Sequence, residues 1–347
     1  MNYKLDDEHL RICVNIDQIY DAVLGTTKEL EKMPLYMSWL KRNNADYLYV
    51  KSNDNTIHKS LGPRSPETEL IYNSYINNRK DLKERLESQS TKLKQYLAQY
   101  SALKLPAIAS LPAQILRKLD AAGELGTNFI VVGTNAFVAY EIEARERFAF
   151  GLDETEDFDL SWCRGSKISF VSQLQDSVQG SPLLDVLKKV DKSFKINNSK
   201  PYQALNNKGY EVELLTAPSV MSTLSKDEVF STAAIPEQEW LLLGKPIRRV
   251  VGAKDISPAP LFVPDPRYMA LHKLWLSKKD TRRNDKKGKD YKQGELLMDA
   301  VIRKMQTSHP VDLDFVLDLP EDLLETFNDW AARHNYDPGN PPELDWF

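Results

Sequence analysis

The sequence predicts an α+β protein in which helices flank a mixed β-sheet domain. Apolar residues recur at helical spacing toward both ends of the chain. Between them lie short β-branched runs bounded by turn residues, of which Phe129-Ile130-Val131-Val132 is the clearest. We therefore expect three regions: an N-terminal helical region over 1–104, a sheet domain over 105–262 and a C-terminal helical region over 263–347.

The N-terminal region is expected to be helical over its first 45 residues, followed by a β-hairpin near 46–60. Ser65 then offers an N-cap, with Pro66 in the first turn of a new helix. The segment from 67 to 103 contains neither Gly nor Pro and is highly charged. It predicts one long helix or two stacked helices that serve as a solvated arm.

The central and C-terminal regions alternate between strand and helix patterns. A Gly turn follows the 129–132 strand, and a break at Pro264 and Pro266 precedes the C-terminal helices. We expect helices over 115–122, 136–144, 183–190, 267–277, 291–305 and 321–333, and further strands over 158–162, 167–171 and 210–215.

Composition narrows the classes of protein that the chain can belong to. It has 347 residues, of which 41% are hydrophobic and 28% charged, as in globular proteins with a substantial core. The net charge is −4, so any polyanion site must be a local basic patch. Cys13 and Cys163 are too far apart for a zinc motif. A polar start and the lack of a long apolar run predict a cytoplasmic protein without membrane contact.

The most informative feature is a carboxylate pair, Asp157 and Asp159, in the segment Thr155-Glu156-Asp157-Phe158-Asp159-Leu160. On a strand both side chains point to the same face. Adjacent anions repel unless a cation lies between them, and Mg²⁺ prefers oxygen ligands. The pair predicts a divalent metal site, although an exposed strand edge would show the same pattern.

Two further features stand on either side of this pair in the sequence. Gly133-Thr134 lies between a strand and a helix, where backbone N–H groups can approach a phosphate. Glu213 shares one strand face with Glu211 and could complete a three-carboxylate cluster if the strands are neighbours. Each feature alone is explained as well by a tight turn or an exposed face, but their order along the chain is informative.

That order resembles the polymerase-beta-like nucleotidyltransferase superfamily, in which a Gly turn, an Asp-x-Asp strand and a third carboxylate follow one another. Thr134 stands where Ser is common, and Glu213 where Asp is common. The segments 59–69, 132–137 and 264–273 are also similar to a bacterial family of nucleotidyltransferase-fold proteins. This family is related to toxin-type nucleotidyltransferases.

The resemblance implies transfer of a nucleoside monophosphate from an NTP, with release of pyrophosphate and with two Mg²⁺ ions as cofactors. Asp157 and Asp159 would bind both ions as catalytic residues, and Glu213 would complete the second metal site.

The same resemblance implies a nucleotide-binding set around the Gly turn. Gly133, Thr134 and Asn135 would contact the β- and γ-phosphates, and Lys273 and Lys289 would contact the triphosphate. The two lysines belong to a basic stretch between Lys273 and Lys292 that could equally be a solvated loop.

Three functions remain open at this point. The basic stretch favours a macromolecular acceptor, either an RNA 3′ end or a protein hydroxyl, and a toxin-like enzyme with an antitoxin-type partner protein would fit. A small-molecule, antibiotic-type transferase would instead show an acidic cleft without a basic rim. A catalytically inactive binding protein of the same fold is the third alternative.

Overall fold

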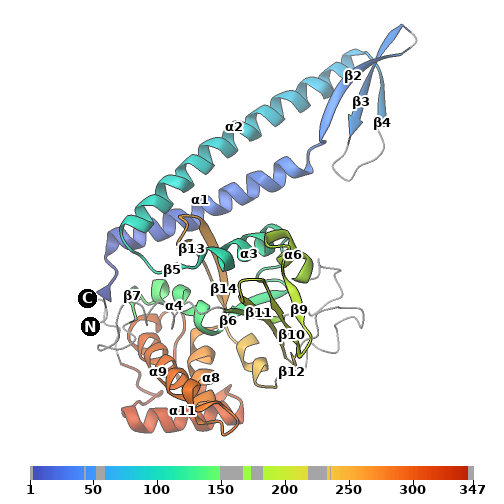
Figure 1. Ribbon diagram of the computed structural model, residues 1–347. Helices are drawn as coiled ribbons and strands as arrows, with labels where there is room; N and C mark the ends of the chain where they lie inside the picture. The colour runs from blue at the N-terminus through green and yellow to red at the C-terminus, as the bar shows by residue number, and fades with distance from the viewer. Residues whose placement is uncertain are drawn as a thin grey trace. The chain divides into compact units, whose positions relative to one another are not determined.

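The structure is a computed structural model, and it describes residues 3–42, 44–51, 59–148, 167–172, 183–217, 233–234 and 236–342. The chain forms two compact units, one built from Met1–Cys13 and Tyr100–Phe347 and the other from Val14–Gln99 (Figure 1). Helices and strands occur in both units, and the predicted α+β class is confirmed. None of the described helices has the length and hydropathy that a bilayer-spanning helix needs.

The unit Val14–Gln99 contains most of two long helices and a three-stranded antiparallel sheet (Figure 1). Its elements are α1 (Asp7–Lys32), β2 (Tyr36–Arg42), β3 (Ala45–Lys51), β4 (Lys59–Pro63) and α2 (Pro66–Ala102). The prediction of helix through residue 45 is wrong beyond Lys32, because residues 36–42 pair along their whole length with β3. β3 matches the first strand of the predicted hairpin, whereas 52–58 lie outside the described residues.

The predicted long helix is a single one, α2, of 37 residues. Its start is capped reciprocally: the Thr68 backbone N–H donates to Ser65 Oγ (3.3 Å), and the Ser65 N–H donates to Thr68 Oγ1 (2.8 Å). These two bonds satisfy backbone donors that a helix start otherwise leaves unpaired, as predicted for Ser65.

The larger unit is built around a mixed sheet with the strand order β6-β8-β11-β10-β9, in which β12 also pairs with β11. Its strands are β6 (Phe129–Val132), β8 (Lys167–Ser172), β9 (Lys195–Asn197), β10 (Lys200–Leu205), β11 (Glu211–Thr216) and β12 (Ala233–Ala234). β8 runs antiparallel to β6 and parallel to β11. Three predicted strands are thus present, whereas the fourth, over 158–162, lies outside the described residues.

A second small sheet was not predicted. β13 (Ile247–Ala253) pairs antiparallel with β14 (Pro258–Val263) and parallel with β5 (Ala107–Ile108). Pro258 and Pro260 hide the strand pattern of β14 in the sequence. Proline has no backbone N–H to donate to a neighbouring strand, so it usually indicates the end of a strand. The remaining elements before the C-terminal helices are β1 (Tyr3–Lys4), α3 (Ser110–Ala121), η1 (Gly133–Ala136), α4 (Phe137–Glu143), β7 (Glu146–Arg147), α6 (Leu183–Val190) and η2 (Pro236–Leu242).

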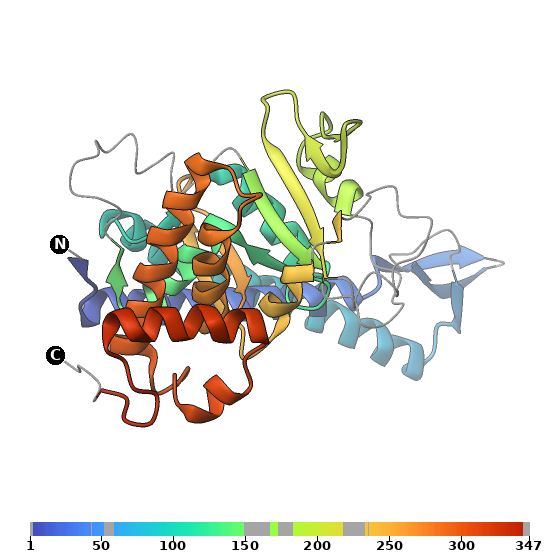
Figure 2. The same cartoon turned by 90° about the horizontal axis from the view of Figure 1, so that it is seen from below.

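The C-terminal helices lie together in the larger unit (Figure 2). They are α8 (Pro266–Lys278), α9 (Asn284–Ala300) with its π-helical continuation η3 (Val301–Met305), α10 (Leu313–Leu317) and α11 (Glu321–His334). The three predicted helices are confirmed, but α9 begins seven residues earlier than predicted, at Asn284. Much of the basic stretch is therefore helix rather than loop.

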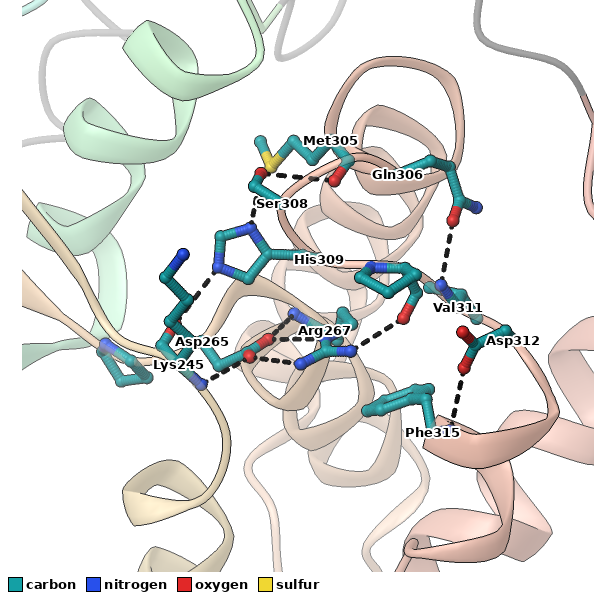
Figure 3. Close-up of polar contacts among 12 residues, drawn as sticks. Lys245, Asp265, Arg267, Met305, Gln306, Ser308, His309, Val311, Asp312 and Phe315 are labelled. Atoms are coloured by element: carbon teal, nitrogen blue, oxygen red, sulfur yellow. Dashed lines mark hydrogen bonds and ion pairs between the residues drawn. The ribbon is translucent and has the colours of Figure 1, made fainter.

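A buried polar cluster fixes the start of α8 (Figure 3). Asp265 is fully buried and caps the helix by accepting from the backbone N–H of Arg267 (2.9 Å). Its carboxylate also binds the Arg267 guanidinium (2.7 Å) and the Lys245 backbone N–H (2.8 Å). Arg267 donates to the Pro310 carbonyl (2.7 Å), and the His309 ring bonds the Lys245 carbonyl (3.1 Å). The cluster ties the start of α8 to the chain before α10.

Close packing of α8 against α9 gives a test of the fold. An added Cβ at Gly294 on α9 would lie 2.7 Å from Leu274 Cγ and 2.9 Å from the Leu274 backbone nitrogen on α8. We expect Gly294→Ala to lower the free energy of unfolding by about 1–3 kcal/mol, because this overlap outweighs the better helix propensity of alanine. Urea denaturation followed by circular dichroism measures the change.

Gly288, on the same helix, is the matched control. Nothing lies within 4 Å of an added Cβ there, so Gly288→Ala should stabilise the protein by up to about 1 kcal/mol. Equal stability of the two variants would contradict the packing.

Candidate active site

A cavity of about 640 Å³ lies in the larger unit, where the turn after β6 meets β11, η2, α8 and α9. This volume is within the usual range of small-ligand sites. Six of the eight predicted site residues line it, namely Gly133, Thr134, Asn135, Glu213, Lys273 and Lys289. The other two, Asp157 and Asp159, lie outside the described residues.

Sheet register places the Gly turn and Glu213 near one another. Val132, the last residue of β6, pairs with Ser169 of β8, and Ser169 pairs with Glu213 of β11. Neighbouring strands are separated by about 4.8 Å, so Val132 and Glu213 are about 10 Å apart across the sheet. Residues 80 positions apart in the sequence therefore border the same cavity.

The turn itself requires glycine. Gly133 has φ +73°, a left-handed conformation that other residues adopt only with strain. The turn is a short 3₁₀ segment that leads into α4, which has only seven residues. Gln293 of α9 approaches the Thr134 hydroxyl at 3.5 Å and so links the turn to the C-terminal helices.

Glu213 faces the cavity because of strand alternation. Val212 and Leu214 are buried on the opposite face of β11, whereas Glu213 and Leu215 line the cavity. Gln203 on β10 donates from Nε2 to Glu213 Oε1 (2.7 Å) and accepts from Asn197 Nδ2 (3.2 Å). This chain of amides holds the carboxylate in place. Glu211, two positions earlier, is not among the lining residues.

A buried ion pair joins α8 to α9 beside the cavity. Lys273 Nζ donates to Asp290 Oδ1 (2.7 Å), with side chains 8% and 2% exposed. Arg282 binds the other carboxylate oxygen of Asp290 at 2.5 Å. Burial by itself would raise the pKa of the Asp290 carboxyl, but Lys273 and Arg282 outweigh it and hold the pKa below its ordinary value.

The side of the cavity formed by α8 and α9 is basic. Among the described residues, five cationic and three acidic side chains line the cavity, namely Lys273, Lys279, Arg282, Lys286 and Lys289 against Glu213, Glu237 and Asp290. Lys279 forms an ion pair with Glu237. The excess of cations therefore comes from the loop between α8 and α9 and from the start of α9, where Lys286 and Lys289 lie.

The sequence model of a protein family described as nucleotidyltransferase matches residues 111–313. The chain belongs to this nucleotidyltransferase family. The match runs from α3 to the start of α10 and includes every element that lines the cavity. Comparison with curated proteins and with solved structures found no match. The prediction of a nucleotidyltransferase enzyme is thereby confirmed.

His272 is a cavity residue of the nucleotidyltransferase to which the sequence alone assigned no role. It is 4% exposed and lines the cavity from α8. Burial, with a smaller contribution from Lys273, lowers the pKa of His272 to about 3, so the imidazole is neutral at pH 7. The one available signal was its position next to Lys273, a residue already predicted to bind nucleotide.

The donor chemistry in the cavity is compatible with a divalent cation. Nucleotidyltransferases generally use NTP and divalent metals. Within the described ranges, no group of three His, Cys, Asp or Glu side chains is positioned to hold a metal. Glu213 supplies one carboxylate that faces the cavity, and carboxylate oxygens are the ligands that hard cations such as Mg²⁺ prefer. The other predicted ligands, Asp157 and Asp159, belong to the segment outside those ranges.

Removing the charge of Asp290 tests the buried pair. We expect Asp290→Asn to lower the free energy of unfolding by about 3–5 kcal/mol, because Lys273 stays buried without its anion. Since the Asp290 pKa is lowered from 3.8, the pair's contribution is complete above that pH and is lost as the pH falls through the folded-state value. Denaturation curves between pH 3 and 7 measure both effects.

Asp285→Asn is the matched control, because Asp285 is also on α9 and forms an exposed ion pair with Arg283, the residue just before the helix. Exposed pairs contribute little, so this variant should unfold like the wild type. A loss of stability shared by the two variants would rule out a special role for the buried pair.

Proposed function

We propose that the nucleotidyltransferase moves a nucleoside monophosphate from an NTP to a macromolecular acceptor in a Mg²⁺-dependent reaction. One observation carries this proposal: the Gly133 turn, the Glu213 carboxylate and the basic side of α8 and α9 line a single cavity. The cavity thus combines groups suited to phosphate oxygens with a group suited to a metal ion.

In the proposed reaction the acceptor hydroxyl oxygen attacks the α-phosphorus of the NTP. A new P–O bond forms, the bond from the α-phosphorus to the bridging oxygen breaks, and pyrophosphate leaves while the hydroxyl proton passes to solvent. When bound, Mg²⁺ would neutralise phosphate charge and lower the pKa of the hydroxyl. Asp157, Asp159 and Glu213 are the residues that would hold it.

The rest of the cavity would position the triphosphate. The Gly133 turn allows backbone N–H groups to approach phosphate oxygens, and Thr134 and Asn135 add polar side chains. Lys289 and Lys273 supply positive charge from two helices that their buried neighbour Asp290 helps to hold together. Catalysis of this kind depends mainly on positioning and charge neutralisation.

The nature of the rim favours a macromolecular acceptor over a small cationic one. A transferase for a cationic antibiotic would need an acidic cleft without a basic rim, whereas Arg282, Lys286 and Lys289 are among the described residues that line this cavity. Lys286, which lines the cavity from the start of α9, would contact an anionic acceptor such as an RNA 3′ end. A protein hydroxyl is the second acceptor compatible with the proposal.

Carboxylate variants test the chemistry. We expect Glu213→Gln to reduce nucleotide transfer by on the order of 100- to 1,000-fold, because a charge that acts on the transition state is lost. Asp157→Asn combined with Asp159→Asn should abolish transfer, as should chelation of Mg²⁺ in the wild type. Labelled NTP incorporation into total RNA and cell extract is the measurement.

Glu211→Gln is the matched control, since Glu211 is on the same strand but does not line the cavity. It should retain wild-type transfer. If the double aspartate variant labels the acceptor as well as the wild type does, the proposed site is wrong. If no wild-type labelling occurs with any NTP, an inactive binding protein becomes the better interpretation.

Identification of the labelled acceptor tests the second part of the proposal. We expect label on an RNA 3′ end, and charge reversal by Lys286→Glu should weaken its labelling at low salt, because a phosphate contact is lost. The resemblance to toxin-type enzymes supports a toxin-like role with an antitoxin-type partner. Growth arrest on expression that depends on Asp157 and Asp159 would support that role, and labelling of a small cationic molecule instead would contradict the acceptor class.

A further inference from the structure

Two buried polar side chains in the cavity wall have no hydrogen-bond partner among the described residues. They are His272, at both ring nitrogens, and Gln238, at Oε1, and each residue is 4% exposed. Both line the cavity. Buried polar groups are nearly always bonded, because leaving one unpaired costs free energy. Two such groups in one wall point to a ligand that completes them.

The His272 ring is held at a defined angle by its neighbours. It stacks on Trp275 with ring centroids 6.5 Å apart and meets Trp240 edge to face at 6.2 Å. Trp240 and Trp275 themselves lie perpendicular at 5.0 Å. The ring is neutral, so one nitrogen donates a hydrogen bond and the other accepts one.

Apolar residues share the faces of α8 and η2 that carry these two side chains, with Lys273, Lys279 and Glu237 close by. Met269 and Leu276 are three residues before and four residues after His272, so all three share one face of α8 and line the cavity. Leu241 stands three residues after Gln238 on the 3₁₀ segment η2, which places the two on one side of it. This wall combines apolar surface with hydrogen-bonding groups of both kinds and differs from the basic rim that suits phosphates.

A planar ring with donors and acceptors along its edge fits such a wall. Of the parts of an NTP, the nucleobase has this character, whereas the triphosphate requires cations and backbone N–H groups. Oε1 of Gln238 can accept from a donor on a base edge, and one nitrogen of the neutral His272 ring can donate to or accept from a second group on that edge.

We propose that His272 and Gln238 bind the edge of the nucleobase and thereby select which NTP the nucleotidyltransferase uses. The inference rests on the proposed function, because it assumes that an NTP occupies the cavity. It assigns the part of the cavity lined by His272 and Gln238 to the base, and the part lined by Gly133 and Lys289 to the phosphates.

The experiment compares binding of ATP, GTP, CTP, UTP and inorganic tripolyphosphate by calorimetry in the presence of Mg²⁺. We expect the wild type to bind one NTP at least about tenfold more tightly than the weakest, since each mismatched hydrogen bond costs about this factor. His272→Phe and Gln238→Met keep the size and remove the hydrogen-bonding atoms. In both variants the ratio of the highest to the lowest NTP affinity should fall toward 1, while the affinity for tripolyphosphate stays unchanged.

Trp330→Phe is the matched control, because Trp330 Nε1 on α11 is also buried without a hydrogen-bond partner in the described part of the chain, but Trp330 is not a lining residue of the cavity. It should keep the wild-type preference. Equal wild-type affinities for the four NTPs, or a uniform loss of affinity for all ligands in the His272 and Gln238 variants, would overturn the inference and leave the proposed function standing. Absence of any NTP binding would overturn both.

Discussion

The buried pair between Lys273 and Asp290 is the interaction on which the site depends. Charges this deeply buried are tolerated only when each has its counterion, so the pair holds α8 and α9 at a set separation. Arg282 completes the charge balance from the loop between the helices. Of the residues that the structure describes, every cationic one in the cavity belongs to these two helices or to the loop that joins them, so the pair also sets where this positive charge lies.

The cavity divides its chemistry between different parts of the fold. The sheet contributes an acidic group, Glu213, held by the amide of Gln203, and the turn at Gly133 contributes backbone. The helices contribute cations at the rim and an apolar wall around His272. A nucleoside triphosphate has a metal-binding chain of phosphates at one end and a planar base at the other, and the proposed roles follow this division.

Local features were predictable from the sequence because short stretches of chain determine them. The turn at Gly133 and the cap at Ser65 each depend on a few consecutive residues. The strand at 36–42 was mistaken for helix, and β14 was missed at its prolines, because pairing with partner strands outweighed local preference there. Alternation on β11 placed both glutamates on one face but did not show which of the two reaches the cavity.

By itself, the sequence determined the fold class, the nucleotidyltransferase family and the residue types needed for the chemistry. These follow from local strand and helix patterns and from the order of the motifs along the chain. Only the tertiary structure decided that Gly133, Glu213 and Lys289 border one cavity, that Lys273 forms an ion pair with Asp290, and that His272 belongs to the wall. The physical reason is that the residues brought together here are at least 17 positions apart in the sequence. Contacts at such separations arise from packing and strand register, which no short segment specifies.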